Sequence, residues 1–479
     1  MVRRRAGSFP LLELDAESGL PLHRQLTEAL RQAIRAGRID GGARLPSTRS
    51  LADDLGVSRS TVVKAFEQLK AEGYLESRIG SGTTIPHGLV QEGAIPPSKP
   101  GGGSREAVDL ELPLPLRPGI PALDEFANSA FGRIVRRVLN DLGAEVLTTG
   151  AHAGDAELRA AVARHLRSNR GVRCHADDII VTTGSQEGLS LAFEVMAARD
   201  DEVWIENPGY FGARNAARVV GLRPRPVPVD HEGLVVSEGI RLWPRARGAY
   251  VTPSHQFPTG CLLSARRRVE LLDWAHRHDA YVVEDDYDSE FRLEGRALPA
   301  LQGIDEHERV IYVGSFSKSL APAIRLGFLV LPPQLRDRAL QIRIDRTGMQ
   351  PLWIQRAAAL FIEEGHFARH VRRTRALYRK RRDALVEAVE VCLEGRASLR
   401  TPTGSMHALL DLEVGLHAAT VAHRLRRSGV IVVPADVFHA DDDEGAGSSL
   451  LLGFGGYTTD AIRAAVERIG FELRGAASL

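Results

Sequence analysis

The chain has 479 residues, of which 43% are hydrophobic and 26% are charged, and its formal net charge is +1. These values are ordinary for soluble globular domains, so they exclude a largely disordered chain and leave material for about two to four domains. The sequence lacks the apolar run of roughly 18 residues that a transmembrane helix needs.

The cysteines and the N-terminus indicate a cellular compartment. Cys174, Cys261 and Cys392 are widely separated and form no CxxC pair, which argues against a disulfide framework and against a zinc site. The basic start, residues 1–5, is not followed by the apolar segment of a secretory signal. We therefore expect a cytoplasmic protein that holds no metal ion and contacts no membrane.

The first 85 residues predict three helices and a hairpin. A helix is expected after Pro21, where apolar residues recur at helical spacing. Ser47 is a good N-cap for a short second helix over residues 48–55, and Ser58 opens a third. The glycine-rich segment 73–85 reads as two short strands around a turn.

The second and third of these helices fit a helix-turn-helix. In that motif the N-terminal side chains of the recognition helix reach base edges in the major groove. Ser58, Arg59, Ser60, Thr61 and Lys64 lie opposite the apolar stripe of the third helix, so they are free to contact DNA. A solvated helix face is the alternative interpretation of the same residues.

The string LPSTRSLADDLGVSRSTVVKAFEQLKAEGYLESRIGSGT resembles the GntR-type winged helix-turn-helix of bacterial transcription regulators. The resemblance covers about residues 20–85 and implies that this part of the chain binds operator DNA. The residues that it would bring to DNA are Arg49, Ser58, Arg59 and Thr61 on the helices, and Arg78 and Gly80 in the wing.

Residues 86–107 separate this head from the rest of the chain. They include four prolines and five glycines, a composition that cannot bury enough apolar surface to offset the entropy of ordering. We expect a DNA-binding domain over residues 1–85, a flexible linker over 86–107 and a second domain, the body, over 108–479.

The body alternates short apolar runs with helical stretches, which predicts a largely parallel sheet covered by helices. The expected strands are 179–183, 203–206, 249–252, 281–284, 310–313 and 328–331. A long helix near 366–393 and strand-like segments at 407–412, 430–433 and 450–454 predict a smaller α+β lobe.

Polar residues follow four of these strands, at 184–186, 253–260, 285–287 and 315–318. Ligands of open α/β sheets bind at the carboxyl ends of strands. A phosphate there would be held by the helix N-terminus after Gly184 and by Ser315, Ser317 and Arg325.

Three further residues fit an aldehyde cofactor with a pyridine ring. Lys318 can form a Schiff base with the aldehyde, Asp285 can keep the ring nitrogen protonated, and Tyr287 can donate to the phenolic oxygen. Taken singly, a lysine in this context is usually a surface lysine, and an acidic pair that ends a strand is often only a helix cap.

The strings VTPSHQFPTG, VEDDYDSEF and GSFSKSLAPAIRLGF resemble the fold-type-I aminotransferase domain in the form carried by MocR/GabR regulators. The resemblance runs from about residue 110 to the end and implies pyridoxal 5'-phosphate as cofactor, with Lys318, Asp285 and Tyr287 in the roles just given. It places Tyr210 beside the cofactor ring, although Tyr210 can also be an ordinary turn residue. The phosphate cup that it implies consists of Gly184, Ser185, Gln186, Ser315, Ser317 and Arg325.

Three departures from ordinary aminotransferases concern the amino-acid side of this site. Phe257 stands where those enzymes have asparagine, a change that the regulators share. The late strand reads Leu450-Leu451-Leu452 where an arginine usually clamps the substrate carboxylate, and residues 148–152 supply no tyrosine for a partner's phosphate. Without that clamp a substrate is oriented less well, which slows such chemistry.

We therefore expect a transcription regulator of the MocR/GabR kind that joins an N-terminal winged helix-turn-helix, mainly α, to an α/β transferase fold of type I with a small α+β lobe. It would sense an amine, an amino acid or pyridoxal 5'-phosphate itself, and the family implies a homodimer. The alternatives are an active aminotransferase that carries a DNA-binding head, and a regulator whose body binds no cofactor.

Overall fold

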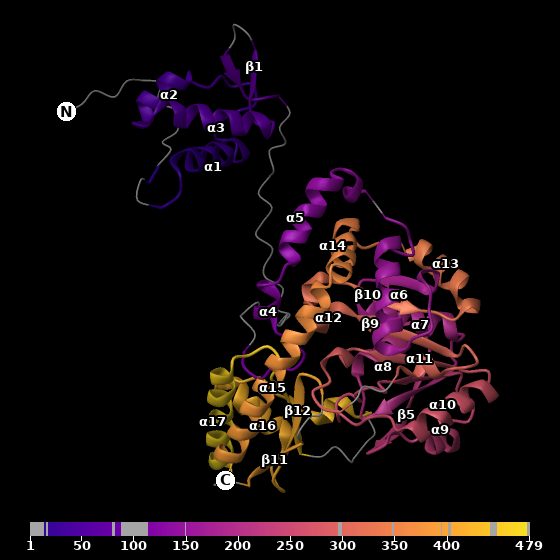
Figure 1. The fold of residues 1–479 in the computed structure, drawn as a ribbon. Coiled ribbons are helices and arrows are strands. Elements are labelled where there is room, and N and C mark those ends of the chain that lie inside the picture. The colour runs from indigo at the N-terminus through magenta and orange to yellow at the C-terminus, as the bar shows by residue number, and fades with distance from the viewer. Residues whose placement is uncertain are drawn as a thin grey trace. The chain divides into compact units, whose positions relative to one another are not determined.

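The computed structural model forms two compact units, Met1–Asp109 and Leu110–Leu479 (Figure 1). Most of the predicted linker, residues 88–107, lies outside the described residues. The residues that the structure describes are 14–15, 18–78, 82–87, 114–148, 150–295, 299–346, 349–393, 395–400, 404–440 and 448–476.

The described part of the first unit contains three helices and an antiparallel hairpin, as the sequence predicts. The elements are α1 (Leu22–Arg35), α2 (Thr48–Leu55), α3 (Arg59–Ala71), β1 (Glu76–Arg78) and β2 (Gly82–Thr84). The side chains of Ser47 and Ser58 each accept a hydrogen bond from a backbone N–H of the following helix, so both are N-caps. Gly56 ends α2 with a φ of 65°, which glycine adopts without strain.

The apolar stripes of α1 and α3 pack on each other to form the core of this unit. Leu26 and Leu30 of α1 and Val62, Phe66 and Leu69 of α3 are all almost completely buried. Burial of one face of α3 leaves its polar face toward solvent, so the helix is held by its stripe and free on the opposite side.

The second unit is built on an eight-stranded mixed sheet. Its order is β3-β10-β9-β8-β7-β4-β5-β6, and β5, β4, β7, β8 and β9 run parallel. The strands are β3 (Ile179–Thr182), β4 (Glu202–Asn207), β5 (Arg223–Asp230), β6 (Gly233–Leu234), β7 (Gly248–Val251), β8 (Tyr281–Asp286), β9 (Val310–Ser315) and β10 (Gly327–Val330).

The last of these strands departs from the parallel sheet that the sequence predicts. β10 runs antiparallel to both of its neighbours, β3 and β9. Residues 316–326 connect β9 to β10, and this connection is too short for the crossover that a parallel strand requires, about a dozen residues or more. The reversal brings the start of β10 to the edge where β9 ends.

Helices cover both faces of the sheet (Figure 1). On one face α7, α8 and α13 pack over β4, β7 and β9, and on the other α9 and α10 pack over the same strands, with α6 and α14 beside them. No described helix has the length and hydropathy needed to span a membrane. The helices are α4 (Leu123–Ala127), α5 (Phe131–Leu142), α6 (Ala156–Arg170), α7 (Ser185–Met196), α8 (Phe211–Val219), α9 (Val236–Leu242), α10 (Ala265–Arg277), α11 (Leu301–Ile304), α12 (Phe316–Ser319), α13 (Arg336–Arg346) and α14 (Leu352–Glu363).

The predicted small α+β lobe follows. Its antiparallel sheet has the order β11-β12-β14-β13, with β11 (Ala397–Arg400), β12 (His407–Leu412), β13 (Val433–Pro434) and β14 (Ser449–Gly453). The helices are α15 (His366–Cys392), α16 (Ala418–Arg427) and α17 (Thr459–Ala476). Of the strand expected at 430–433, only residue 433 is in a strand, as the first of the two residues of β13.

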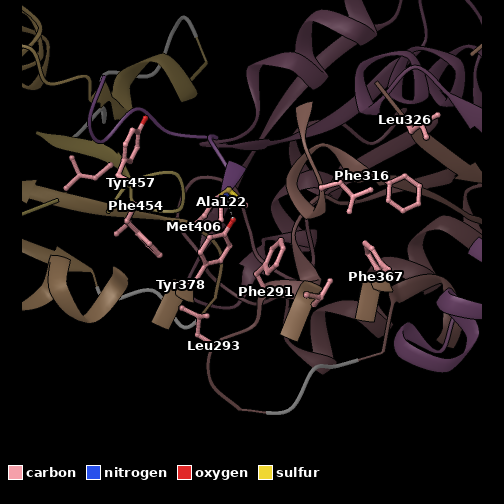
Figure 2. Packing of buried hydrophobic residues seen from close by; sticks show 14 of the residues in the cluster. Ala122, Phe291, Leu293, Phe316, Leu326, Phe367, Tyr378, Met406, Phe454 and Tyr457 are labelled. Atoms are coloured by element: carbon pink, nitrogen blue, oxygen red, sulfur yellow. Dashed lines mark hydrogen bonds between the residues drawn. The ribbon is translucent and has the colours of Figure 1, made fainter. Parts of the chain in front are cut away.

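Tyr378 fastens α15 to the rest of the unit (Figure 2). Its ring is fully buried with the centroid 4.9 Å from that of Phe291, and its hydroxyl accepts the N–H of Ala122 at 3.1 Å. A buried phenol needs such a partner for its oxygen. The contact holds the segment before α4 on the long helix, close to Lys318 as described below.

Candidate functional site

The outer face of α3 carries most of the residues predicted to bind DNA. Arg59 and Lys64 are exposed on α3, Arg49 is exposed on α2, and Thr61 is half-buried. Ser58 is exposed, but its hydroxyl caps the helix: it accepts the N–H of Thr61 at 3.2 Å and lies 2.8 Å from the Thr61 hydroxyl. Three cations of the two helices, Arg49, Arg59 and Lys64, are therefore exposed to solvent, as contacts with phosphate require.

The predicted wing is described only in part. Arg78 is the last residue of β1 and pairs with Gly82 across the hairpin. Gly80 and the side chain of Arg78 lie outside the described residues. The hairpin is joined to the loop before α2, because the N–H of Leu45 donates to the carbonyl of Thr83 at 2.9 Å.

In the body, the ends of β3, β8 and β9 lie at the same edge of the sheet as the start of β10. Gly327 of β10 lies opposite Thr182 of β3 on one side and Ser315 of β9 on the other. A Cβ on Gly327 would lie 2.9 Å from the Cα of Gly184, so only glycine permits this approach. The register therefore brings Gly184 and Ser315, which precede α7 and α12, next to one another.

These two helix starts and Arg325 carry groups of the kind that can bind an anion. Gly184 precedes α7 with a φ of 120° and leaves its first N–H groups without a side-chain cap, and no atom lies within 4 Å of a Cβ built there. The Ser315 hydroxyl accepts the N–H of Ser317 at 3.1 Å. Arg325 is exposed in the left-handed region, with a φ of 53°. Free N–H groups, hydroxyls and a guanidinium are the donors that phosphate needs.

Ser185 and Gln186 are the first two residues of α7. Ser185 is half-buried, whereas Gln186 is exposed and its amide Nε2 donates to the carbonyl of Gly212 at 3.0 Å. The Gln186 side chain is thus engaged with α8, and its backbone N–H remains the group that it can offer to an anion.

Asp285 is a buried carboxyl with one oxygen left over. Its Oδ2 accepts the hydroxyl of Tyr250 at 2.8 Å, and its Oδ1 is buried with no hydrogen-bond partner among the described residues. Burial raises the pKa of Asp285 to about 7, against the lowering effect of the Tyr250 hydrogen bond. An unsatisfied buried acceptor of this kind fits a protonated ring nitrogen.

The neighbouring Asp286 has the opposite environment. Its Oδ2 accepts from Arg170 Nε at 2.8 Å, from the Tyr312 hydroxyl at 2.6 Å and from Ser289 at 2.8 Å. Burial alone would raise the pKa of Asp286, but the Arg170 guanidinium and these donors hold it below its ordinary value. Asp286 is therefore a structural ion-pair partner, and Asp285 is the free carboxyl.

Lys318 lies in α12, half-buried, and its ammonium donates to the carbonyl of Gly119 at 2.7 Å. Burial lowers the pKa of Lys318, and the nearby Asp288 opposes that effect. Five lysines occur in the chain, and in residues 108–479 the other is Lys380, which is exposed on α15. Lys318 is thus the enclosed primary amine of the body.

Phe257 joins the two predicted site tyrosines. Its ring centroid lies 5.9 Å from that of Tyr210 and 6.0 Å from that of Tyr287, with the rings nearly perpendicular. Phe257 also contacts Phe438 of the small lobe at 5.0 Å. Burial raises the pKa values of Tyr210 and Tyr287, with Asp285 adding to both, so both tyrosines are neutral donors close to that carboxyl.

The late strand has no cation, as its sequence indicates. Leu450, Leu451 and Leu452 are fully buried, and Leu451 packs in one cluster with Phe438 and Phe257. Leu450 and Leu452 belong to the other, larger cluster, so Leu451 is the residue of this strand that packs beside Phe257. Of the 148–152 segment, the structure describes all but residue 149, and the His152 carbonyl accepts from Arg343 Nε at 3.3 Å.

Residues 22–85 match the bacterial regulatory proteins of the gntR family, and residues 132–469 match class I and II aminotransferases. The chain is 37% identical over 475 residues to the probable rhizopine catabolism regulatory protein MocR of Rhizobium meliloti. The match covers 96% of this chain and 95% of that protein. The chain belongs to the MocR-type helix-turn-helix transcriptional regulators.

Further relatives agree with this membership of the MocR-type family. The pyridoxine biosynthesis transcriptional regulator PdxR of Corynebacterium glutamicum is 36% identical, over 92% of this chain and 93% of that one. The fold is similar to that of LysN, an α-aminoadipate aminotransferase of Thermus thermophilus, with a TM-score of 0.70 and 29% identity over 76% of this chain and 93% of that one. The LysN structure contains N-(5'-phosphopyridoxyl)-L-leucine. The MocR-type chain thus combines a regulator's head with an aminotransferase fold.

Sequence reasoning missed Tyr250 and Arg170, and it gave no role to His255 within the segment 253–260. Tyr250 and Arg170 reach the two aspartates from β7 and α6, and the Nδ1 atom of His255 lies 2.9 Å from the Tyr287 hydroxyl. Tyr250 and His255 had the signal of a polar group in or beside a strand expected to be buried, whereas Arg170, at the end of a helix, had none; the partners of all three are 32 to 116 residues away along the chain.

Proposed function

We propose that this regulator binds pyridoxal 5'-phosphate in its body and that Lys318 is the covalent attachment point. Two observations together carry the proposal. Lys318 is an enclosed lysine that donates to the Gly119 carbonyl, and Oδ1 of Asp285, on the neighbouring strand β8, is buried without a partner among the described residues. A base and an acid partner of this kind are what an aldehyde with a pyridine ring requires.

The side chains around this pair suit the remaining groups of the cofactor. Asp285 would hold the ring nitrogen, Tyr287 the phenolic oxygen, and Tyr210 would lie beside the ring. The phosphate would bind at the start of α7 and α12, held by Gly184, Ser185, Gln186, Ser315, Ser317 and Arg325. When bound, the cofactor supplies an aldehyde that captures primary amines and an electron sink.

Each protein group has its own task toward that cofactor. The lowered pKa of Lys318 makes its neutral amine more available as a nucleophile. Burial disfavours the ionised form of Asp285, and the protonated ring nitrogen would supply the positive charge that stabilises this form. Tyr287 keeps its proton because burial raises its pKa, so its hydroxyl donates at neutral pH.

The head supports binding of operator DNA. Arg59 and Lys64 of α3 and Arg49 of α2 are exposed, and we assign them to one interface together with Ser58, Thr61, Arg78 and Gly80. A dimer would present two such heads to paired half-sites. We therefore place the protein in the cytoplasm as a homodimer, with residues 1–85 as head, 86–107 as linker and 108–479 as body.

The effector that we propose is an amine, an amino acid or pyridoxal 5'-phosphate itself, which reaches the body at Lys318. An effector changes DNA binding only by the difference in its affinity for the two states of the protein. The buried leucines Leu450–Leu452, of which Leu451 packs beside Phe257, favour a sensing role over rapid turnover, because substrate carboxylates are left without an arginine at that place.

An active aminotransferase with a DNA-binding head is the second candidate, favoured by the likeness of the body to LysN. Turnover decides between them. The purified protein is loaded with pyridoxal 5'-phosphate and given an amino donor with a keto acceptor, and product is followed with time. Regulation predicts a spectral change on adding amine without sustained product formation, whereas steady transamination at enzymatic rates would contradict it.

A further inference from the structure

His255 lies directly behind Tyr287, the residue that the proposed function assigns to the cofactor's phenolic oxygen. Nδ1 of His255 lies 2.9 Å from the Tyr287 hydroxyl oxygen and 3.6 Å from Oδ2 of Asp288. The first distance is that of a hydrogen bond, and the second is longer than one. His255 follows β7 and Tyr287 follows β8, so adjacent parallel strands hold the two side chains in place.

The surroundings of the imidazole decide which nitrogen carries the proton. Nδ1 faces the hydroxyl of Tyr287, which can accept, and at a longer distance the carboxyl of Asp288, whose pKa burial raises. Nε2 is buried and has no hydrogen-bond partner among the described residues. Because a buried N–H without an acceptor is rarer than an unused lone pair, we assign the proton to Nδ1. Burial lowers the pKa of His255 to about 4, so the ring is neutral and has this single N–H.

The direction of the hydrogen bond follows from that tautomer. Nδ1–H donates to the Tyr287 oxygen. The Ser405 hydroxyl is a second hydrogen-bond neighbour of that oxygen. Burial raises the pKa of Tyr287, and Ser405 opposes that effect, as a donor does. With donors on its oxygen, the tyrosine's own proton is left to point elsewhere. In the reverse arrangement the tyrosine proton would be used on His255, and a lone pair would face the cofactor oxygen. We propose that His255 is a positioning residue that turns the Tyr287 O–H toward the phenolic oxygen of the cofactor. The inference rests on the proposed function, because Tyr287 has this task only with cofactor bound.

The small lobe packs against the back of this imidazole. His407, at the start of β12, has its ring centroid 5.4 Å from that of His255, and its own Nδ1 lies 3.0 Å from the Ser405 hydroxyl. Arg292 adds a positive charge near His255 but donates from Nε to the Glu294 carbonyl. His407 therefore packs edge-on against the imidazole, and Nδ1–H is the polar contact by which His255 acts.

The experiment follows the visible absorbance of the cofactor at Lys318 against pH in the full-length, loaded protein. Without the hydrogen bond from the Tyr287 O–H, the cofactor's phenolic oxygen carries more negative charge. It then holds the proton that it shares with the nitrogen of Lys318 more tightly, so the pH midpoint of the spectral change rises. His255→Phe keeps a ring in the same packing and should raise it by about one pKa unit. Tyr287→Phe should raise it further, and the double variant should match Tyr287→Phe alone, because His255 acts through the tyrosine.

A conservative variant separates this role from packing. The amide of Asn lies where Nδ1 lies in histidine, so His255→Asn should restore the midpoint of the wild type. The amide of Gln lies nearer Nε2, so His255→Gln should behave like His255→Phe. His255→Gln takes the place of His255→Phe in the experiment where the Phe variant does not fold.

An unmoved midpoint in His255→Phe or His255→Gln, beside a moved one in Tyr287→Phe, would overturn the inference. So would additive shifts in the double variant. Identical spectra of the wild type and Lys318→Ala would instead overturn the proposed function, and this inference with it.

Discussion

The two adjacent aspartates of β8 should respond to pH with opposite signs in the cofactor-free protein. The perturbation is Asp285→Asn, compared with Asp286→Asn as the matched control. Asparagine can still accept the Tyr250 hydroxyl at position 285, but it cannot balance the Arg170 guanidinium at position 286.

The magnitude for Asp285 comes from its pKa, raised from 3.8 to about 7 by burial. At 1.36 kcal/mol for each pKa unit, this corresponds to about 4 kcal/mol. The unfolded chain releases the proton first, so the contribution of Asp285 to stability is full below about pH 4 and is lost as the pH rises to about 7. Asp285→Asn lacks this loss and should be more stable than the wild type at pH 8 by up to about 4 kcal/mol.

Asp286 follows the opposite course. Its lowered pKa gives stability that is present at neutral pH and is lost as the pH falls. Asp286→Asn leaves Arg170 buried without its counter-charge, which costs about 3–5 kcal/mol.

Urea unfolding followed by tryptophan fluorescence measures these effects in the body alone, because the four tryptophans are residues 204, 243, 274 and 353. Midpoints are collected from pH 4.5 to 8 for the wild type and both variants. Curves for Asp285→Asn and the wild type that stay parallel across this range would refute the assignment of Asp285 as a buried carboxyl without a partner. With cofactor present the order should reverse, since only the wild type offers the ring nitrogen a carboxylate.

Three other changes test the two units separately. Lys318→Ala should remove the cofactor absorbance while Lys380→Ala keeps it, and both variants should still shift a DNA fragment selected by the wild type. Arg59→Ala should weaken binding to that fragment by about 10- to 100-fold in a gel-shift titration without changing cofactor uptake, as loss of a base contact does; an unchanged titration would remove Arg59 from the interface. Ser58→Ala should destabilise the head by about 1 kcal/mol, because it deletes the cap of α3. Circular dichroism measures the thermal unfolding of the head, and an unfolding midpoint equal to that of the wild type would contradict the prediction.

Much of the architecture was predictable because it depends on local patterns. The N-caps Ser47 and Ser58 and the apolar stripe of α3 are encoded within a few residues, and the head has the helices that they predict. The strands of the body that are buried on both faces read as short apolar runs and were found in the sequence.

Other parts depend on tertiary pairing or contradict local propensity. β5 was not predicted, because its sequence RPRPVPVD alternates proline with charge and proline removes ladder donors. It is tolerated next to the edge of the sheet, with only the two residues of β6 beyond it. The direction of β10 depends on the length of a connection rather than on its own residues.

The candidate site shows the same division. Lys318, Asp285 and Tyr287 were found because each follows or ends an apolar strand, where the sheet gathers polar ends. Their pairing with Tyr250 and with His255 could not be found in that way. Strand register brings them in, and β7 and β8 are adjacent in the sheet but about thirty residues apart in the chain.

The most direct measurement identifies the lysine that carries the cofactor. The loaded protein is reduced with borohydride and digested, and the modified peptide is located by mass spectrometry among the five lysines at positions 64, 70, 99, 318 and 380. We predict one pyridoxyl group per chain, at Lys318. Modification spread over the exposed lysines, or a body that takes up no label at residue 318, would contradict the account.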